Sequence, residues 1–114
     1  MLAILFALTT MPAGQAAPRP VLFSYEETVR CAGLAQAASE LEGGESTDGQ
    51  SLFDAALYWS LAASQAASAS GKPARAADTD QTRARILAVR QLSTANAQAR
   101  ADLARCRART PDLG

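Results

Sequence analysis

The residues with the most definite chemistry in this sequence are its two cysteines, Cys31 and Cys106. They lie far apart, and not in the C-x-x-C arrangement of a thioredoxin-like redox centre or a haem attachment site. In an exported chain two such cysteines favour one structural disulfide, which for a loop of this length would stabilise the fold by about 4 kcal/mol. A pair of free thiols and a bridge to another chain are the alternatives.

The residues that most enzymes require are absent. The chain has no histidine, which is the most common general base, proton shuttle and metal ligand. No Cys-His or Ser-His pair can therefore form within it, and two distant cysteines cannot complete a zinc site. The run Gly71-Lys72-Pro73 lacks the hydroxyl residue of a phosphate-binding loop. We therefore expect a protein that is not an enzyme and that holds no cofactor and no metal.

One short stretch gathers large side chains in a chain that otherwise relies on alanine. Its members are Phe53, Leu57, Tyr58 and Trp59. If these side chains are buried, they supply the volume that alanine cannot give to a core. If they are exposed, they form an aromatic anchor of the kind that dominates protein–protein interfaces. The cluster is thus a candidate for either the core or a partner surface.

The charges are balanced overall but uneven along the chain. The formal net charge is zero, so no general attraction to nucleic acid or to an acidic membrane is expected. Acidic residues predominate up to Tyr58, whereas basic residues predominate from Lys72 onward. The simplest interpretation is that the two halves of the chain face each other, and a charged partner is the alternative.

The elements that must position these residues are helices. Alanine favours helix but buries little surface, so the core must depend on a few larger side chains. The predicted core consists of Val29, Leu34, Leu41, Leu52, Phe53, Leu57, Trp59, Leu61, Ile86, Val89, Leu92 and Leu103. The sequence has no alternating segment typical of a β-strand, which indicates an all-α domain.

Local signals place four helices near residues 24–42, 51–70, 78–92 and 94–109. Ser24 with Glu27 forms a capping box at the first helix. Ser51 is the predicted start of the second helix.

The third helical region is expected to begin at Asp78, and Thr110-Pro111 closes the last one. Together the segments predict a single domain over residues 17–114, a small alanine-rich bundle of three to four helices.

The cysteines constrain how these helices are connected. In an up-down-up bundle of three helices, Cys31 and Cys106 would lie at opposite ends, and the first helix alone is about 27 Å long. The Cα atoms of a disulfide must come within about 7 Å of each other. A break near Ser93-Thr94 allows this, because four helices in up-down-up-down order bring both cysteines to one end. The alternative keeps the last helix whole and runs the loop 43–50 back along the first helix.

The first residues have the pattern of a secretory signal. Leu2 to Leu8 is an unbroken apolar run, Pro12 follows it, and small residues lie before a predicted cut after Ala16. The run is too short to span a bilayer, which takes about 20 apolar residues. We expect residues 1–16 to be a signal peptide and the mature protein to be periplasmic or secreted, without stable membrane insertion. An uncleaved tether is the alternative.

These observations predict an exported, non-enzymatic protein that works by binding another protein or as a structural component of the envelope. A small periplasmic chaperone or stress protein is one alternative, and an inhibitor or subunit of an envelope enzyme is another. No nucleic-acid partner is expected, while association with further copies of the chain is compatible with the alanine-serine half of the second helix.

Overall fold

The computed structural model describes residues 23–112, and all of the regular structure in this range is helical. The helices are α2 (Tyr25–Glu42), α3 (Thr47–Ala69), α4 (Ala74–Ser93) and α5 (Ala97–Arg109). A disulfide between Cys31 and Cys106 links α2 to α5, so the predicted bundle of four helices with its first and last members joined is confirmed. The predicted signal peptide, 1–16, lies outside the described residues.

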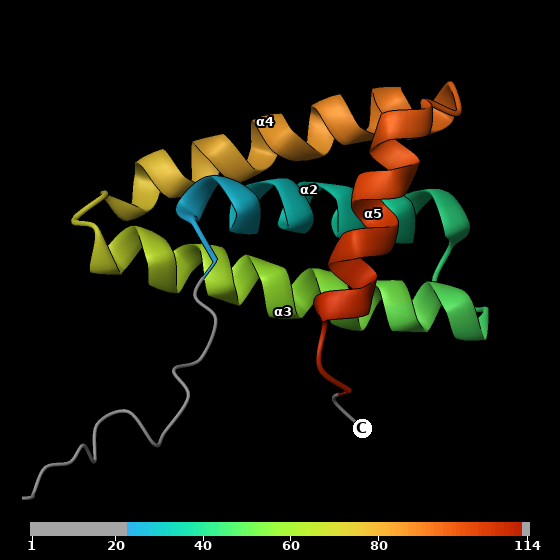
Figure 1. The fold of residues 1–114 in the computed structure, drawn as a ribbon, viewed down its shortest axis with the longest axis horizontal. Coiled ribbons are helices and arrows are strands. Elements are labelled where there is room, and N and C mark those ends of the chain that lie inside the picture. Colours follow the sequence, from blue (N-terminus) through green and yellow to red (C-terminus); the bar gives the residue numbers. More distant parts are fainter. Residues whose placement is uncertain (1–22, 113–114) are drawn as a thin grey trace, which may run out of the picture.

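Helix α2 is the centre of the arrangement. It packs against α3 along one side and against α4 along the other, while α3 and α4 touch each other little (Figure 1). These three helices run roughly alongside one another and alternate in direction. The short α5 returns from the end of α4 and crosses the face of α2 (Figure 1). Its crossing brings the Cα atom of Cys106 within 5.5 Å of that of Cys31.

The start of α2 follows the predicted capping box. The Ser24 hydroxyl accepts a hydrogen bond from the Glu27 backbone N–H at 3.0 Å. The Glu27 carboxylate accepts one from the Ser24 backbone N–H at 3.0 Å in return. This pair satisfies two backbone donors that the first turn of a helix would otherwise leave free.

Two other predicted starts are wrong by four residues each. Helix α3 begins at Thr47 rather than Ser51, because the Ser46 hydroxyl caps it by accepting from the Gly49 backbone N–H at 2.9 Å. Helix α4 begins at Ala74 rather than near 78, directly after Pro73. The φ of −62° at Pro73 is already suited to entering a helix.

The predicted break in the last helical region is present. Helix α4 ends at Ser93, and Ala95 turns the chain with a φ of +57°. The side chain of Asn96 then caps α5 by accepting from the Ala99 backbone N–H at 2.8 Å. Helix α5 therefore begins at Ala97, three residues after the predicted start.

The core is built mainly from alanine, with Leu34 and Trp59 as its largest fully buried side chains. Of the twelve predicted core residues, Leu34, Leu52 and Trp59 are buried. Val89, Leu92 and Leu103 are partly buried against them, and Val29 is half-buried. The prediction is wrong for five others, which are about half exposed or more: Leu41, Phe53, Leu57, Leu61 and Ile86. Where α2 meets α4 at Gly33, the backbones lie too close together to admit a large side chain.

Gly33 shows how close this approach is. A Cβ atom at this position would lie 2.6 Å from the backbone carbonyl carbon of Ala84 on α4 and 2.7 Å from the Cβ of Ala84. Backbone atoms cannot move aside as the end of a flexible side chain can. The absence of a side chain at Gly33 therefore sets the distance between α2 and α4.

We predict that Gly33→Ala destabilises the fold by about 1–3 kcal/mol, although alanine is the better helix former. The measurement is denaturant unfolding of the oxidised protein. Gly44→Ala is the matched control, because a Cβ atom there meets no atom within 4 Å. Equal stability of the Gly33 and Gly44 variants would contradict the close contact.

Candidate functional site

The predicted cluster of large side chains is divided between two sides of α3. Trp59 has no exposed surface, whereas the side chains of Phe53 and Leu57 are 53% and 54% exposed. The division follows from helix geometry, since two residues of a helix are separated by about 200° of rotation. Leu57 and Trp59 must therefore point in nearly opposite directions. Trp59 therefore belongs to the core, Tyr58 is half-buried against the core, and Phe53 and Leu57 belong to the surface.

Trp59 is enclosed by polar and aromatic partners. Its indole Nε1 donates a hydrogen bond to the Thr110 hydroxyl at 2.8 Å, at the end of α5. The rings of Phe23 and Tyr58 meet it edge to face, each with its centroid 5.1 Å away. Because its one polar group is satisfied, the indole can be buried without a desolvation penalty. Trp59 thus anchors α3 beneath the end of α5.

We predict that Trp59→Ala lowers the free energy of unfolding by about 3–5 kcal/mol, because it leaves a large cavity in a core of small residues. Leu57→Ala on the same helix is the control, and we expect it to change stability by no more than about 0.5 kcal/mol. Denaturant unfolding with helical ellipticity as the signal measures both. Similar losses for the two variants would contradict the division of α3 into a buried and an exposed side.

The exposed side of α3 carries three large apolar side chains in a row. Phe53, Leu57 and Leu61 are spaced four residues apart, so they lie along one face of the helix. Leu61 is the most exposed of the three, at 60%. We call these three residues the α3 stripe. The sequence indicated Phe53 and Leu57 as site candidates and assigned Leu61 to the core, although its spacing matches theirs.

A shallow groove borders the α3 stripe where α3 meets α2. It has a volume of about 170 Å³, and its lining includes Phe53 and Leu57 from α3 together with Gln36, Ser39 and Glu40 from α2. The α2 side of the groove is therefore polar, and the α3 side is apolar except for Ser60. Such a border between apolar anchors and a polar rim is typical of protein-binding surfaces.

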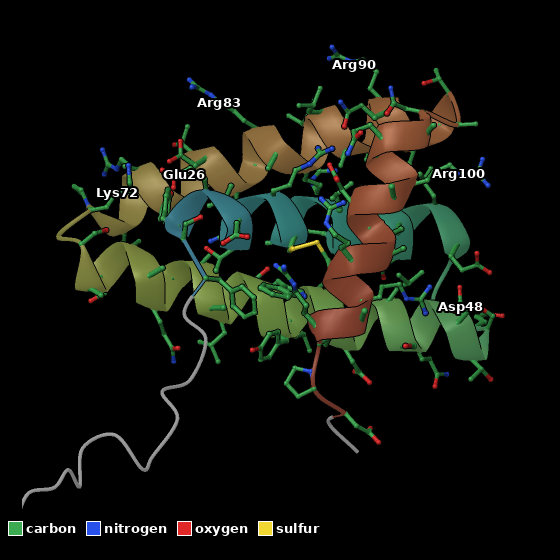
Figure 2. All side chains as sticks on the ribbon, viewed as in Figure 1. Glu26, Asp48, Lys72, Arg83, Arg90 and Arg100 are labelled. Carbon is green, nitrogen blue, oxygen red and sulfur yellow. A yellow bond between two sulfur atoms is a disulfide. The ribbon has the colours of Figure 1, made fainter. Side chains whose placement is uncertain are left out.

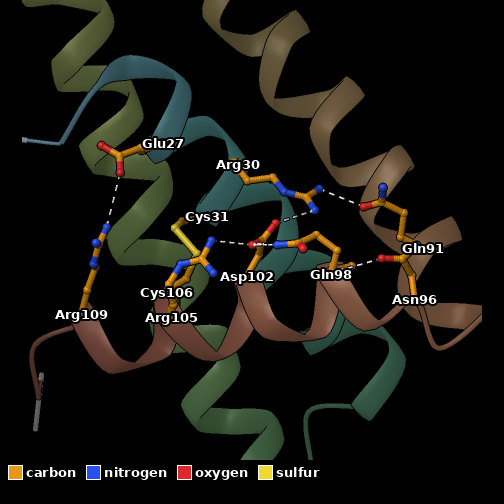
Figure 3. Close-up of polar contacts among 11 residues, drawn as sticks. Glu27, Arg30, Cys31, Gln91, Asn96, Gln98, Asp102, Arg105, Cys106 and Arg109 are labelled. Atoms are coloured by element: carbon orange, nitrogen blue, oxygen red, sulfur yellow. Dashed lines mark hydrogen bonds and ion pairs between the residues drawn. A yellow bond between two sulfur atoms is a disulfide. The ribbon is translucent and has the colours of Figure 1, made fainter.

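Polar and charged side chains surround the disulfide where α5 crosses α2 (Figure 3). Arg30 on α2 donates to Asp102 on α5 at 3.1 Å and to Gln91 on α4 at 2.9 Å, so it joins three helices. Desolvation raises the pKa of Asp102, but hydrogen bonds from Gln98, Arg105 and Arg30 outweigh it and leave the pKa below its ordinary value. Every charge in this network has a partner, which indicates a structural role.

Two further ion pairs fasten α5 to the acidic front half of the chain. Arg109 lies 3.4 Å from Glu27, and Arg107 lies 2.7 Å from Asp48. The pKa of Glu27 is lowered first by the hydrogen bond from the Ser24 backbone and also by Arg109. Arg107 lowers the pKa of Asp48. Acidic residues of the front half of the chain thus form ion pairs with basic residues of the back half, within the same molecule.

The lowered pKa values of Asp102, Glu27 and Asp48 predict that acidic pH weakens the contacts between α5 and the rest of the fold. The three carboxyl groups have lower pKa values in the folded chain than in the unfolded one, so their contribution is complete above about pH 5 and is lost as the pH falls through the folded values. We expect a lower melting temperature at about pH 2.5 than at pH 7, with a smaller difference in Asp102→Asn. A melting temperature that is the same at both pH values would contradict this role.

One tyrosine lies in a polar contact at the start of α2. The Tyr25 hydroxyl donates to the Asp80 carboxylate at 2.7 Å, and Lys72 lies over the ring, 4.8 Å from its centroid. Burial and the bond to Asp80 raise the pKa of Tyr25 to about 12. This contact ties the start of α2 to the start of α4 (Figure 2 labels Lys72 at that end).

Features of other kinds of site are not found among residues 23–112. No group of three or more histidine, cysteine, aspartate or glutamate side chains there could hold a metal ion. In the same range, no buried side-chain nitrogen or oxygen lacks a hydrogen-bond partner. None of the four helices combines the length and apolar character needed to cross a membrane.

Comparisons with other proteins give no further guide to the site. No protein-family model, no curated protein and no solved structure matches this chain. The α3 stripe and its neighbouring groove are therefore the candidate functional site on geometry alone.

Proposed function

We propose that this protein acts in an exported compartment as a non-enzymatic binding protein, and that the α3 stripe is the surface it presents to a protein partner. The observation that carries the proposal is the outward position of Phe53, Leu57 and Leu61 in a chain whose core is alanine. The signal peptide predicted at residues 1–16 supports the compartment, and the lack of histidine supports a role without catalysis.

The exposed apolar area of the α3 stripe favours binding to a partner. Three side chains that are half exposed or more leave about 300 Å² of apolar surface in contact with water. A patch of this size is within the range that is often functional on monomeric proteins. Large side chains at intervals of four residues are also the usual anchors when one helix recognises another chain.

The two sides of the groove add selectivity to this apolar surface. Glu40 lies at its rim and is held by an ion pair with Arg85 on α4, at 3.0 Å. A partner would therefore meet apolar anchors next to a fixed pair of charges. Polar groups placed in this way mainly determine the orientation and identity of the partner.

We predict that a photo-reactive residue at position 57 cross-links to protein in the native exported fraction, whereas one at Leu87 does not. Leu87 is the matched control because it is a similarly exposed leucine, 45%, on a different helix. Mass spectrometry of the products identifies the partner and its contact residues. One dominant protein supports a dedicated interaction, a broad set of clients supports the chaperone alternative, and equal yields at positions 57 and 87 would contradict the proposal.

A further inference from the structure

We propose that the outer side of α4 binds the surface of an anionic lipid bilayer. This side carries two arginines with two apolar side chains between them, and we call these four residues the α4 face: Arg83, Ile86, Leu87 and Arg90. Helix α2 lies between α4 and most of α3, so the α4 face is separate from the α3 stripe (Figure 1). The inference therefore goes beyond the proposed function and does not depend on it.

The α4 face lies in a basic stretch of the chain, although the net charge of the whole chain is zero. Residues 81–101 contain four arginines and no acidic residue. One of these arginines forms an ion pair with Glu40 on α2. Within the described range, the other three have no ion-pair or hydrogen-bond partner, and they are Arg83, Arg90 and Arg100. A local attraction to anionic groups is thus compatible with a neutral chain.

Helix geometry gathers the α4 face on one side of α4. Arg83 and Arg90 are seven residues apart, so they share one side of the helix and lie about 10 Å apart along its axis. Ile86 and Leu87 lie between them and are 46% and 45% exposed. Figure 2 shows Arg83 and Arg90 extending from the outer edge of α4, away from the other helices. Apolar side chains flanked by arginines are typical of helices that bind a membrane surface.

The acidic residues closest to the α4 face are directed elsewhere. Asp78 is rotated by about 140° from Arg83 around the axis of α4. Asp80 accepts a hydrogen bond from the Tyr25 hydroxyl at 2.7 Å, at the start of α2. Asp102 on the neighbouring α5 is held by three hydrogen bonds of its own. The guanidinium groups of the α4 face are therefore free to bind lipid phosphate.

The shape of the α4 face favours a bilayer over a protein partner. Four side chains on one helix form a convex ridge, which offers much less than the roughly 800 Å² per partner of a stable protein interface. A fluid bilayer can surround such a ridge, because its headgroups move to meet each charge. The arginine stems can lie along the apolar boundary while their charged ends stay among the headgroups. With so few charges, the binding is weak and reversible.

Cosedimentation of the oxidised protein with vesicles tests the proposal. We expect binding to phosphatidylglycerol vesicles and not to phosphatidylcholine vesicles, and we expect its loss when the salt concentration rises from about 10 mM to about 500 mM. Arg83→Gln and Arg90→Gln should each weaken the binding about fivefold. Arg75→Gln is the matched control and should weaken it less than about twofold, because Asp78 lies one turn away and offsets the charge of Arg75.

Three results of this experiment would overturn the inference. They are equal binding to both lipids, no binding to phosphatidylglycerol at about 10 mM salt, and equal losses in all three variants. The melting temperature of each variant verifies its fold, which we expect to be unchanged because these arginines form no ion pairs within the described residues.

Fluorescence quenching identifies the side of the molecule that meets the bilayer. Leu87→Trp and Leu57→Trp each add an exposed indole, while the buried Trp59 is an internal reference in both variants. Brominated phosphatidylglycerol should quench the indole at position 87 and leave the one at position 57 unquenched. Equal or stronger quenching at position 57 would show adsorption through the α3 stripe and would overturn the inference.

Cross-linking separates this inference from the proposed function. A photo-reactive residue at Leu87 should react with phosphatidylglycerol in the vesicles, and capture of an acidic protein at Leu87 in the native exported fraction would overturn the inference. Capture of a protein at position 57 leaves the proposed function standing whatever the vesicles show. Binding to vesicles through the α4 face likewise leaves this inference standing if position 57 captures no protein.

Discussion

The close approach of α2 to its neighbours is the constraint on which the rest of the structure depends. Most side chains are small where α2 meets α3 and α4, and at Gly33 even a Cβ atom would overlap the backbone of Ala84. Alanine therefore fills most of the core, and Leu34, Leu52 and Trp59 are its large buried side chains. A core of this kind buries little surface per residue, so the fold needs further support. The disulfide between α2 and α5 supplies it.

The same constraint explains the surface of α3. Large apolar side chains that cannot enter the core must lie outside, and helix geometry gathers three of them in the α3 stripe. Trp59 stays inside because α5 crosses at that point, where Thr110 binds its indole nitrogen. The fold therefore leaves an organised apolar surface on one side of α3, and this surface is the basis of the proposed protein-binding role.

Much of the architecture could be predicted from local signals, because they act over a few residues. The capping box at Ser24 and the break after Ser93 are two such signals, and the cysteine positions required the latter. The predicted starts of α3 and α4 are wrong because Ser46 and Ser51 offer equivalent caps, and because the φ of Pro73, which suits entry into a helix, was not counted as a start signal. The sides of α3 were not predictable, since Leu52, Phe53, Leu57 and Trp59 point in several directions from the helix and spacing cannot show which of them meet α2.

The leucines of this chain divide between a small, tightly packed core and the exposed α3 stripe. Methyl NMR with a soluble paramagnetic agent measures this directly. We expect strong relaxation enhancement for the methyl groups of Leu57 and Leu61 and almost none for those of Leu34 and Leu52. Shielded methyl groups at Leu57 and Leu61 together with accessible ones at Leu34 would contradict the account.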